Sequence, residues 1–192
     1  MLKEHNQRKY NRLESFDYSQ NSYYFVTICT KDRVNYFGEI SNHGKMVLND
    51  CGVIAFDRLK NIPQFYNDVF LDEFIVMPNH IHAIIIIQNY NINVGTEQCS
   101  VQSDNLAKGT MTAQCAVTTN EKSNLSQVIK SYKEICTKQI RNALGLIEFQ
   151  WQRSFYDHII RNQESLAKIR EYIQNNPAKW HLDKYNYENL YE

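Results

Sequence analysis

Two adjacent strand-like runs in the middle of the chain constrain its fold most. Residues 69–76 (VFLDEFIV) and 80–87 (HIHAIIII) are rich in β-branched and aromatic residues, and only the tripeptide MPN separates them. Because a Pro-Asn step is a turn signal, the two runs predict neighbouring strands joined by a short connection. His80 and His82 then stand at the start of the second strand, at an end of the sheet that a ligand can approach.

These two histidines are suited to share one metal ion. Side chains alternate between the faces of a strand, so His80 and His82 point the same way and Ile81 points the opposite way. Two residues of strand rise separate their backbones by about 6–7 Å, so both imidazoles can reach one cation. Such a site needs a third ligand from elsewhere. A hydrogen-bonded pair of core histidines is the alternative that the pattern leaves open.

Length and composition indicate one folded domain. The chain has 192 residues, of which 43% are hydrophobic, and we predict a single domain over 1–192 with its core at about 20–180. No apolar run is long enough to span a membrane, and the first residues lack the apolar stretch of a secretion signal. The five cysteines are scattered, odd in number and without a C-x-x-C pair. We therefore expect a cytoplasmic protein with reduced thiols and no membrane partner.

Charge is balanced overall but uneven along the chain. The formal net charge is zero, whereas basic side chains outnumber acidic ones by 10 to 6 over residues 124–184. Residues 1–14 carry four basic side chains against two acidic ones. The two ends of the chain are therefore the candidate anion-facing parts. Solvated helix faces explain the same excess equally simply.

The order of predicted elements is α+β. Strands are expected at 23–30, 37–40, 45–48, 69–76 and 80–87, with a short extended piece at 148–152; helices are expected from the cap Asn49 to about 61, from Leu125 to near Gly145, and over 163–175. The predicted buried stripe of the first helix is Val53, Ile54, Phe56 and Leu59. Residues 89–122, rich in Asn, Thr, Ser and Gln, predict a long exposed loop. This order fits one antiparallel sheet with helices packed on a face.

The last predicted helix carries a second chemical feature. Tyr172 and Asn176 are four residues apart and therefore share one helix face. A tyrosine hydroxyl can act as a covalent nucleophile, but its pKa near 10 leaves it weak at neutral pH unless a metal assists. The amide oxygen of Asn176 can complete the metal site begun by the histidines. The alternative to a catalytic role is structural: Tyr172 is then a core residue of the helix, and Asn176 ends the helix before Pro177.

Three segments together resemble a known family. Residues 77–82 (MPNHIH) resemble the signature of the IS200/IS605-type single-tyrosine transposases, in which two histidines flank a hydrophobic residue. Residues 149–162 (FQWQRSFYDHIIRN) and 169–177 (IREYIQNNP) are similar to the corresponding blocks of the REP-associated tyrosine transposases. The resemblance covers roughly residues 20–180.

The resemblance implies a fold and a chemistry. The fold is a ferredoxin-like (RRM-like) antiparallel sheet, and the chemistry is metal-assisted attack of a tyrosine on single-stranded, hairpin-containing DNA, which leaves a 5′-phosphotyrosine and a free 3′-OH. By position, His80, His82 and Asn176 are the implied ligands of Mg²⁺ or Mn²⁺, and Tyr172 is the implied nucleophile. Insertion-sequence members usually carry glutamine where this chain has Asn176, which points to the REP-associated branch. The oligomeric state stays open between monomer and homodimer.

The second block contains a competing nucleophile, Tyr156. It has no same-face ligand partner one turn on, because that position is Ile160, so we favour Tyr172. Four residues of this block are assigned to DNA contact, with arginine suited to bidentate phosphate binding and tryptophan to base stacking. These residues are Trp151, Arg153, His158 and Arg161. The alternative for His158 and Arg161 is to brace the catalytic helix, and the alternative for Trp151 is a packed core position.

Two other function classes remain open. One is a noncatalytic single-strand nucleic-acid binder, in which Tyr23, Tyr24 and Phe25 of an RRM-like sheet stack on bases. The other is a metallohydrolase in which the two histidines hold Zn²⁺ and activate water. Neither alternative forms a covalent link between protein and DNA, so such a link separates both from the transposase hypothesis.

Overall fold

The computed structural model describes residues 16–88 and 122–186. The predicted loop 89–122 therefore lies outside the described residues except for its last position. The elements are β1 (Ser22–Cys29), η1 (Lys31–Arg33), β2 (Gly38–Ile40), β3 (Met46–Leu48), α1 (Asp50–Lys60), η2 (Ile62–Gln64), β4 (Val69–Val76), β5 (His80–Ile87), α2 (Leu125–Leu144), β6 (Tyr156–Ile160), α3 (Gln163–Asn175) and η3 (Pro177–Leu182), where η marks a 3₁₀ helix.

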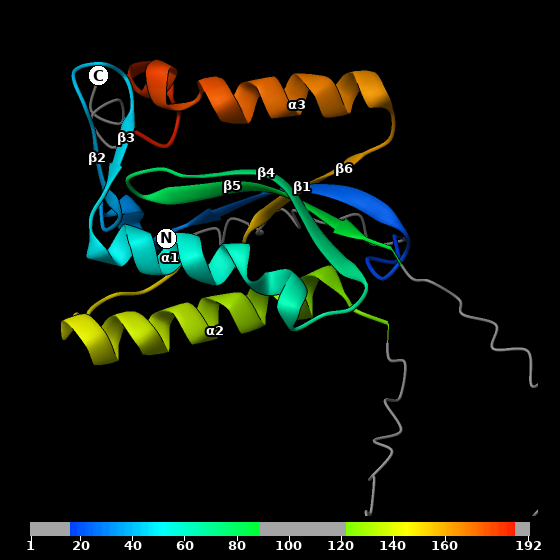
Figure 1. Ribbon diagram of the computed structural model, residues 1–192, viewed down its shortest axis with the longest axis horizontal. Coiled ribbons are helices and arrows are strands. Elements are labelled where there is room, and N and C mark those ends of the chain that lie inside the picture. Colours follow the sequence, from blue (N-terminus) through cyan, green and yellow to red (C-terminus); the bar gives the residue numbers. More distant parts are fainter. Residues whose placement is uncertain (1–15, 89–121, 187–192) are drawn as a thin grey trace, which may run out of the picture.

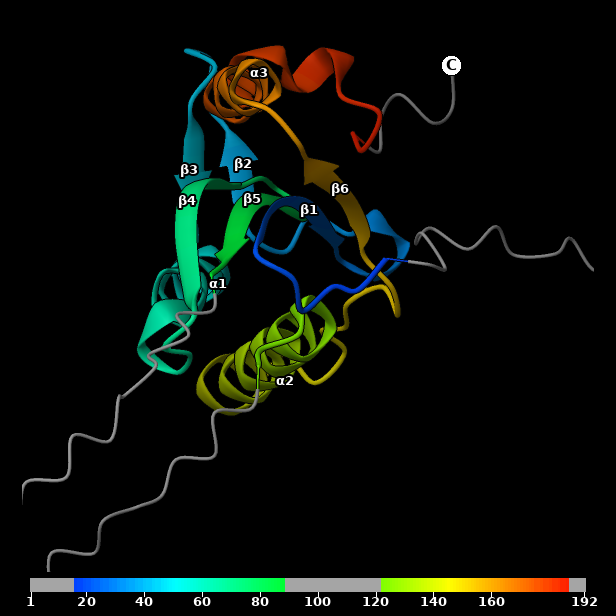
Figure 2. The ribbon, with the colours of Figure 1, turned by 90° about the vertical axis from the view of Figure 1, so that its right-hand side faces the viewer.

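Four strands form one antiparallel sheet in the order β4-β5-β1-β6, and β2 pairs with β3 in a separate hairpin. Helices α1 and α2 lie together under one face of the sheet, and α3 lies over the opposite face (Figures 1 and 2). The predicted α+β class, with an antiparallel sheet and helices on a face, is confirmed. The structure adds that the helix carrying Tyr172 covers the other face.

The alternation of side chains along the central strands explains both layers. Ile81 and Ile85 of β5 point into the main core with α1 and α2, whereas Ile84 points into a smaller cluster under α3. That smaller cluster consists of Ile84, Ile160, Leu166 and Ile173. Each isoleucine buried in this way contributes about 1.5–3 kcal/mol. A β5 that is apolar on both faces therefore fits a central strand between two layers.

Asparagine side chains begin the three α-helices. Asn49 accepts a hydrogen bond from the Gly52 amide, and Asn124 and Asn162 cap α2 and α3 in the same manner. The end of α2 is also local, because Gly145 has a φ of 67°, the left-handed conformation that glycine adopts without strain. The helix bounds predicted from the sequence are therefore confirmed to within one or two residues.

One strand was missed and one local prediction was wrong. The extended piece 148–152 makes a bridge between Trp151 and Thr30, and the strand that the sequence did not predict is β6, which pairs with β1. In α1, Val53 is exposed, and the buried stripe is Cys51, Gly52, Ala55 and Leu59. Gly52 is required there because a Cβ atom would lie 2.1 Å from the Phe37 carbonyl oxygen. Leu59 is buried as predicted, and Ile54 and Phe56 are partly buried against the core, so only Val53 of the predicted stripe faces solvent.

A β-bulge in β4 anchors α3. The pairing of β4 with β5 shifts by one residue between Leu71 and Phe74, and such a bulge re-aims the side chains that it contains. Asp72 within the bulge accepts from Arg170 of α3 at 2.9 and 2.5 Å, and Glu73 accepts from Gln174 at 3.1 Å. The bulge thus fixes the position of the helix that carries Tyr172.

Arg170→Ala should lower the free energy of unfolding by about 1 kcal/mol, because it removes a two-pronged ion pair that is partly shielded from water. The matched control is Lys168→Ala on the same helix, whose ion pair with Glu164 is exposed on both sides. We expect the control to change stability by less than about 0.5 kcal/mol. Equal urea midpoints for the two variants would contradict the anchoring role of Arg170.

Candidate metal centre and nucleophile

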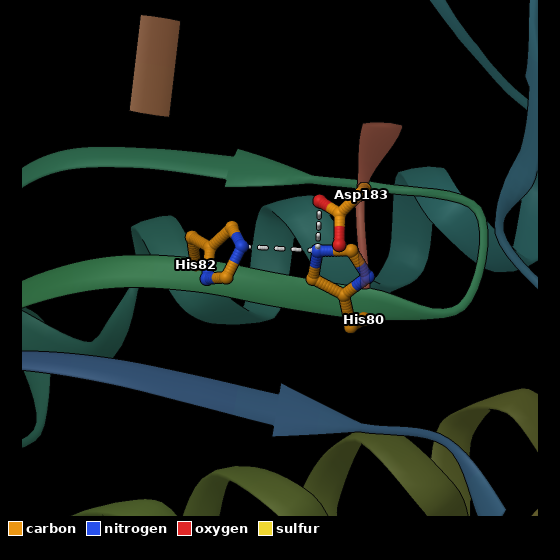
Figure 3. A group of neighbouring side chains, drawn as sticks. All are labelled: His80, His82 and Asp183. Atoms are coloured by element: carbon orange, nitrogen blue, oxygen red, sulfur yellow. Dashed lines mark hydrogen bonds and ion pairs between the residues drawn. The ribbon is translucent and has the colours of Figure 1, made fainter. Parts of the chain in front are cut away.

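Strand β5 places His80 and His82 on the face of the sheet that α3 covers. Their Nε2 atoms lie 3.1 Å apart, and the side chains are 0% and 1% exposed. Figure 3 shows both rings directed at the same point between them. The predicted pairing of the two histidines on one face of the strand is therefore present in the structure.

Each ring is held by a hydrogen bond at its other nitrogen. The Nδ1 atom of His80 lies 2.9 Å from Asn79 Oδ1, and the Nδ1 atom of His82 lies 2.9 Å from the Thr27 hydroxyl. Thr27 stands opposite His82 in the register between β1 and β5. Such partners fix ring orientation and leave Nε2 of each histidine as the ligand atom.

Burial keeps both imidazoles neutral. Loss of hydration lowers the pKa of His82 to about 3, with a further contribution from Lys184. Burial also lowers the pKa of His80 well below its usual value, helped by His82, Arg33 and Lys184. A neutral imidazole is the form that binds a metal ion.

The metal-free protein should consequently lose stability in acid. A histidine in the unfolded chain titrates near pH 6.5, and folded His82 does so only near 3. Below about pH 6.5 the unfolded chain therefore binds more protons, and each such histidine lowers the free energy of unfolding by up to about 1.4 kcal/mol per pH unit. Urea unfolding between about pH 7.5 and pH 5 measures this slope. His82→Gln should flatten it, whereas His43→Gln, on the exposed hairpin, should not; equal slopes in wild type and His82→Gln would refute the assignment.

Asp183 is a third candidate ligand, and sequence reasoning missed it. Its Oδ2 atom lies 3.8 Å from His80 Nε2, and the ligand atoms of His80, His82 and Asp183 all lie within 4.8 Å of one another. Asp183 follows η3, a 3₁₀ turn that brings the chain back over the sheet. In the sequence, Asp183 is only a single acidic residue six positions beyond Pro177. Its place near the histidines depends on the path of the 3₁₀ turn, which the sequence does not show.

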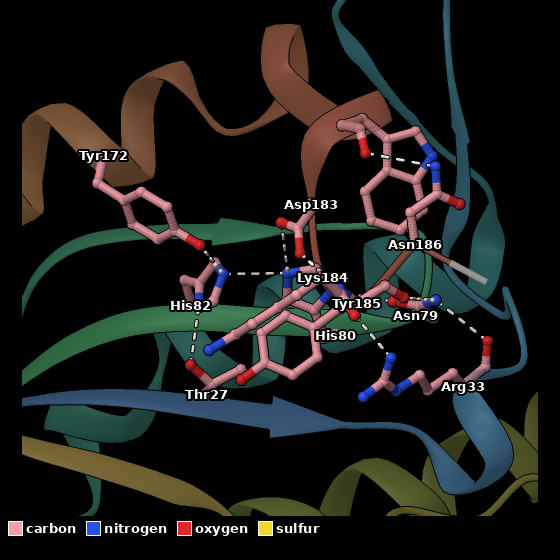
Figure 4. Close-up of polar contacts among 11 residues, drawn as sticks. Thr27, Arg33, Asn79, His80, His82, Tyr172, Asp183, Lys184, Tyr185 and Asn186 are labelled. Carbon is pink, nitrogen blue, oxygen red and sulfur yellow. Dashed lines mark hydrogen bonds and ion pairs between the residues drawn. The ribbon is translucent and has the colours of Figure 1, made fainter. Parts of the chain in front are cut away.

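The segment from Trp180 to Asn186 covers the His80 side of the centre (Figure 4). The ring of Trp180 is stacked on His80 at a centroid distance of 6.0 Å, and Tyr185 lies 4.8 Å from His80. Arg33 of η1 holds this segment by donating to the Lys184 carbonyl at 2.6 Å. The opposite, His82 side of the centre faces α3 (Figure 4).

Tyr172 stands on that opposite side. Its hydroxyl oxygen lies 3.2 Å from His82 Nε2, and its ring packs edge-on against His82 and Phe25. The residue is 42% exposed. Partial burial raises the pKa of its hydroxyl, whereas a hydrogen bond with Asn176 lowers it. The structure thus brings a solvent-reachable phenol next to the paired imidazoles.

Asn176, one turn further along, fits the predicted role of an oxygen ligand. It is 3% exposed, and its Oδ1 atom is buried without a hydrogen-bond partner among the described residues. A buried acceptor of this kind costs about 1–3 kcal/mol unless something satisfies it, and a cation is one way to do so. Nitrogen, carboxylate and amide donors together suit a divalent ion such as Mn²⁺, without excluding others.

Tyr156 lies further from the histidines. It is in β6 opposite Thr27, and its ring contacts Tyr185 at a centroid distance of 6.3 Å. Tyr156 therefore shares the α3 face of the sheet, but Tyr185 lies between it and the centre. Of the two candidate nucleophiles, Tyr172 is the one whose hydroxyl lies within hydrogen-bond distance of a histidine.

The residues predicted to contact DNA fall into two groups. His158 and Arg161 are exposed and line a hollow of about 410 Å³ beside the start of α3, together with Asn162 and Ser165. Arg153 is exposed on the connection before β6. The Trp151 ring packs against Phe37, Tyr132 and Phe149 in the main core. Its predicted base stacking has no support from this position.

The fold has a counterpart among solved structures. The chain superimposes on a solved REP-associated tyrosine transposase, bound in that structure to a REP hairpin, with a TM-score of 0.52 over 90% of this chain and 76% of the other at 17% identity. The fold is that of a tyrosine transposase. A structure from Deinococcus radiodurans, described as a candidate transposase, aligns with a TM-score of 0.44 at 15% identity over 85% of this chain and 97% of its own, and no argument rests on it.

A curated relative defines the family more closely. An uncharacterized protein of Haemophilus influenzae is 35% identical over 177 residues, which are 92% of each chain. The chain belongs to the same family as this protein. No family model matches the sequence. Among the described residues, no helix has the length and apolar character needed to cross a membrane.

Proposed function

We propose that this protein is a metal-dependent single-stranded DNA endonuclease and strand transferase of the tyrosine transposase type, acting in the cytoplasm. The observation that carries the proposal is the contact between the Tyr172 hydroxyl and His82 Nε2, beside a second buried imidazole. The two Nε2 atoms lie 3.1 Å apart, close enough for both to reach one ion, because metal–imidazole bonds are about 2.0–2.1 Å long. Fold likeness supports the same reading.

In the proposed reaction, the Tyr172 oxygen attacks the phosphorus of a DNA phosphodiester. A bond forms between that oxygen and phosphorus, the bond from phosphorus to O3′ breaks, and the proton lost by the phenol balances the proton gained by the 3′-OH. The Tyr172 hydroxyl lies 3.2 Å from His82 Nε2, so the attacking oxygen stands beside the atom that would hold the ion. When bound, a divalent ion supplies polarisation of the phosphate and stabilisation of the leaving oxygen. The covalent link conserves the bond energy, so reversal rejoins strands.

His158 and Arg161 are the proposed phosphate contacts, because both line the hollow beside α3. Arginine offers two parallel donors to a phosphate. Arg161 stands just before α3, the helix that carries Tyr172, which supports a DNA strand that passes this edge of the sheet on its way to the nucleophile. The partner that we propose is single-stranded DNA with a hairpin; monomer and homodimer both remain compatible with it.

The test is incubation of the protein with end-labelled single-stranded hairpin DNA and Mn²⁺, followed by a denaturing gel. The expected product is a protein band shifted by the mass of the 5′-linked strand. A perfectly paired linear duplex of the same sequence is the control and should give no product. Cleavage without any adduct would favour the metallohydrolase, and efficient cutting of the duplex would contradict the proposal.

The noncatalytic alternative loses its proposed stacking surface. Tyr24 is fully buried in the main core, and Tyr23 and Phe25 pack under α3. An RRM-like sheet binds bases through exposed aromatics on its open face. In this protein α3 covers that face, so base stacking on β1 would require the helix to move away.

Two substitutions distinguish the candidate oxygen ligands. Asp183→Asn should weaken Mn²⁺ binding by about tenfold or more, because it removes a charged oxygen donor near His80. Asn176→Ala should also weaken binding while retaining part of the adduct, since two imidazoles and water still hold the ion. Calorimetry with Mn²⁺ measures both effects. Unchanged affinity in Asn176→Ala would remove that residue from the ligand set.

A further inference from the structure

We propose that Asn79 is a positioning residue that sets the tautomer of His80, keeping the proton on Nδ1 and the lone pair on Nε2. This inference rests on the proposed role of His80 as a metal ligand. Asn79 is 1% exposed, and it lies in the tight connection between β4 and β5, immediately before the first histidine. Its side chain makes three hydrogen bonds, and together they leave one consistent arrangement of hydrogens.

The orientation of the Asn79 amide follows from its two carbonyl partners. Its Nδ2 atom lies 3.1 Å from the Arg33 carbonyl oxygen and 2.9 Å from the Tyr185 carbonyl oxygen. Carbonyl oxygens only accept hydrogen bonds, so the NH₂ group must face both of them. The remaining atom, Oδ1, then faces His80 Nδ1 at 2.9 Å. A flipped amide would place an oxygen against two carbonyl oxygens in a buried site.

The tautomer of His80 follows from that orientation. An amide oxygen accepts and cannot donate, so Nδ1 of His80 must carry a hydrogen. A neutral imidazole has one hydrogen, and its lone pair is then on Nε2. This is the atom that faces His82 at 3.1 Å and Asp183 at 3.8 Å. Asn79 therefore presents the free electron pair of His80 to the proposed ion before any ion binds.

The second histidine lacks this constraint. The partner of His82 Nδ1 is the Thr27 hydroxyl, which can donate or accept. Thr27 consequently orients the ring of His82 without choosing its tautomer. This difference makes Thr27 a matched control, because it is also buried and also bonded to a proposed ligand.

Asn79 also links His80 to the C-terminal segment. The Tyr185 carbonyl that accepts from Asn79 belongs to the covering segment, in which Asp183 Oδ1 accepts from the Tyr185 amide at 2.7 Å. Arg33 contributes its own carbonyl to Asn79 and its guanidinium to the Lys184 carbonyl. The segment that supplies Asp183 thus also holds the residue that prepares His80.

The experiment is long-range ¹H–¹⁵N NMR of the histidine rings in the metal-free protein near neutral pH, which reports directly which nitrogen carries the hydrogen. We expect the Nδ1–H form for His80 in wild type and in Thr27→Val. Asn79→Ala should give a mixture of tautomers at His80 and about tenfold to a hundredfold weaker Mn²⁺ binding by calorimetry. If Asn79→Ala fails to fold, the wild-type spectrum alone still shows whether His80 carries its hydrogen on Nδ1.

An Nε2–H form of His80 in wild type would overturn the inference, as would an unchanged Nδ1–H form in folded Asn79→Ala. Failure of the proposed function looks different. A protein that forms no DNA adduct but shows the Nδ1–H form supports the inference and refutes the function. A protein that forms the adduct but has His80 in the Nε2–H form supports the proposed function and refutes the inference about Asn79.

Discussion

Tyr172→Phe should abolish the covalent protein–DNA adduct while DNA binding persists. The substitution removes the only oxygen that contacts His82 Nε2 from α3 and keeps the ring that packs edge-on against Phe25. Loss of a covalent nucleophile removes the chemical step itself, so we expect a decrease of at least about 10³-fold. The adduct is measured on a denaturing gel, and binding by fluorescence anisotropy with the same labelled hairpin.

Tyr156→Phe is the matched control for that experiment. Tyr156 is similarly exposed on the same side of the sheet, but its ring contacts Tyr185 and not a histidine among the contacts described. It should keep most of the adduct. An adduct that persists in Tyr172→Phe and disappears in Tyr156→Phe would exchange the roles of the two tyrosines and leave the reaction class unchanged.

His82→Ala should remove both Mn²⁺ binding and cleavage. His82 contributes a candidate ligand atom 3.1 Å from that of His80, and the Tyr172 hydroxyl lies 3.2 Å from the same atom, so its loss affects the proposed ion and the surroundings of the nucleophile together. The sequence alone predicts that the fold stays intact. The structure changes this expectation, because truncation leaves a cavity in a buried site and removes one hydrogen-bond partner of the Thr27 hydroxyl, at a cost of about 2–3 kcal/mol.

Calorimetry with Mn²⁺ and urea unfolding separate the two effects of His82→Ala. His80→Ala should behave similarly, since it leaves Asn79 Oδ1 without its partner. His43→Ala, on the exposed β2–β3 hairpin, is the control and should change neither measurement. Mn²⁺ affinity that survives in folded His80→Ala and His82→Ala would disprove the metal centre.

The elements that the sequence predicted well carry local signals. The two strands β4 and β5 have the predicted bounds because apolar β-branched runs and a Pro-Asn turn define them without reference to other segments. Helix α3 also matches, because its cap Asn162 and the following Pro177 are local start and stop signals. Strand β6 was not predicted because polar and apolar residues do not alternate clearly along it. It forms a strand through its pairing with β1.

The sequence by itself determined the ingredients of the candidate site. Strand periodicity placed His80 and His82 on one face, and helix periodicity placed Tyr172 and Asn176 on another, since both repeats depend only on backbone geometry. Only the tertiary structure decided that these faces meet, 90 residues apart in sequence at the contact between His82 and Tyr172. The physical reason is that long-range contacts set this arrangement. They are the packing of α3 on the second face of the sheet, the ion pair between α3 and Asp72 in the bulge, and the path of the C-terminal segment that brings Asp183 to the histidines. No local pattern encodes them.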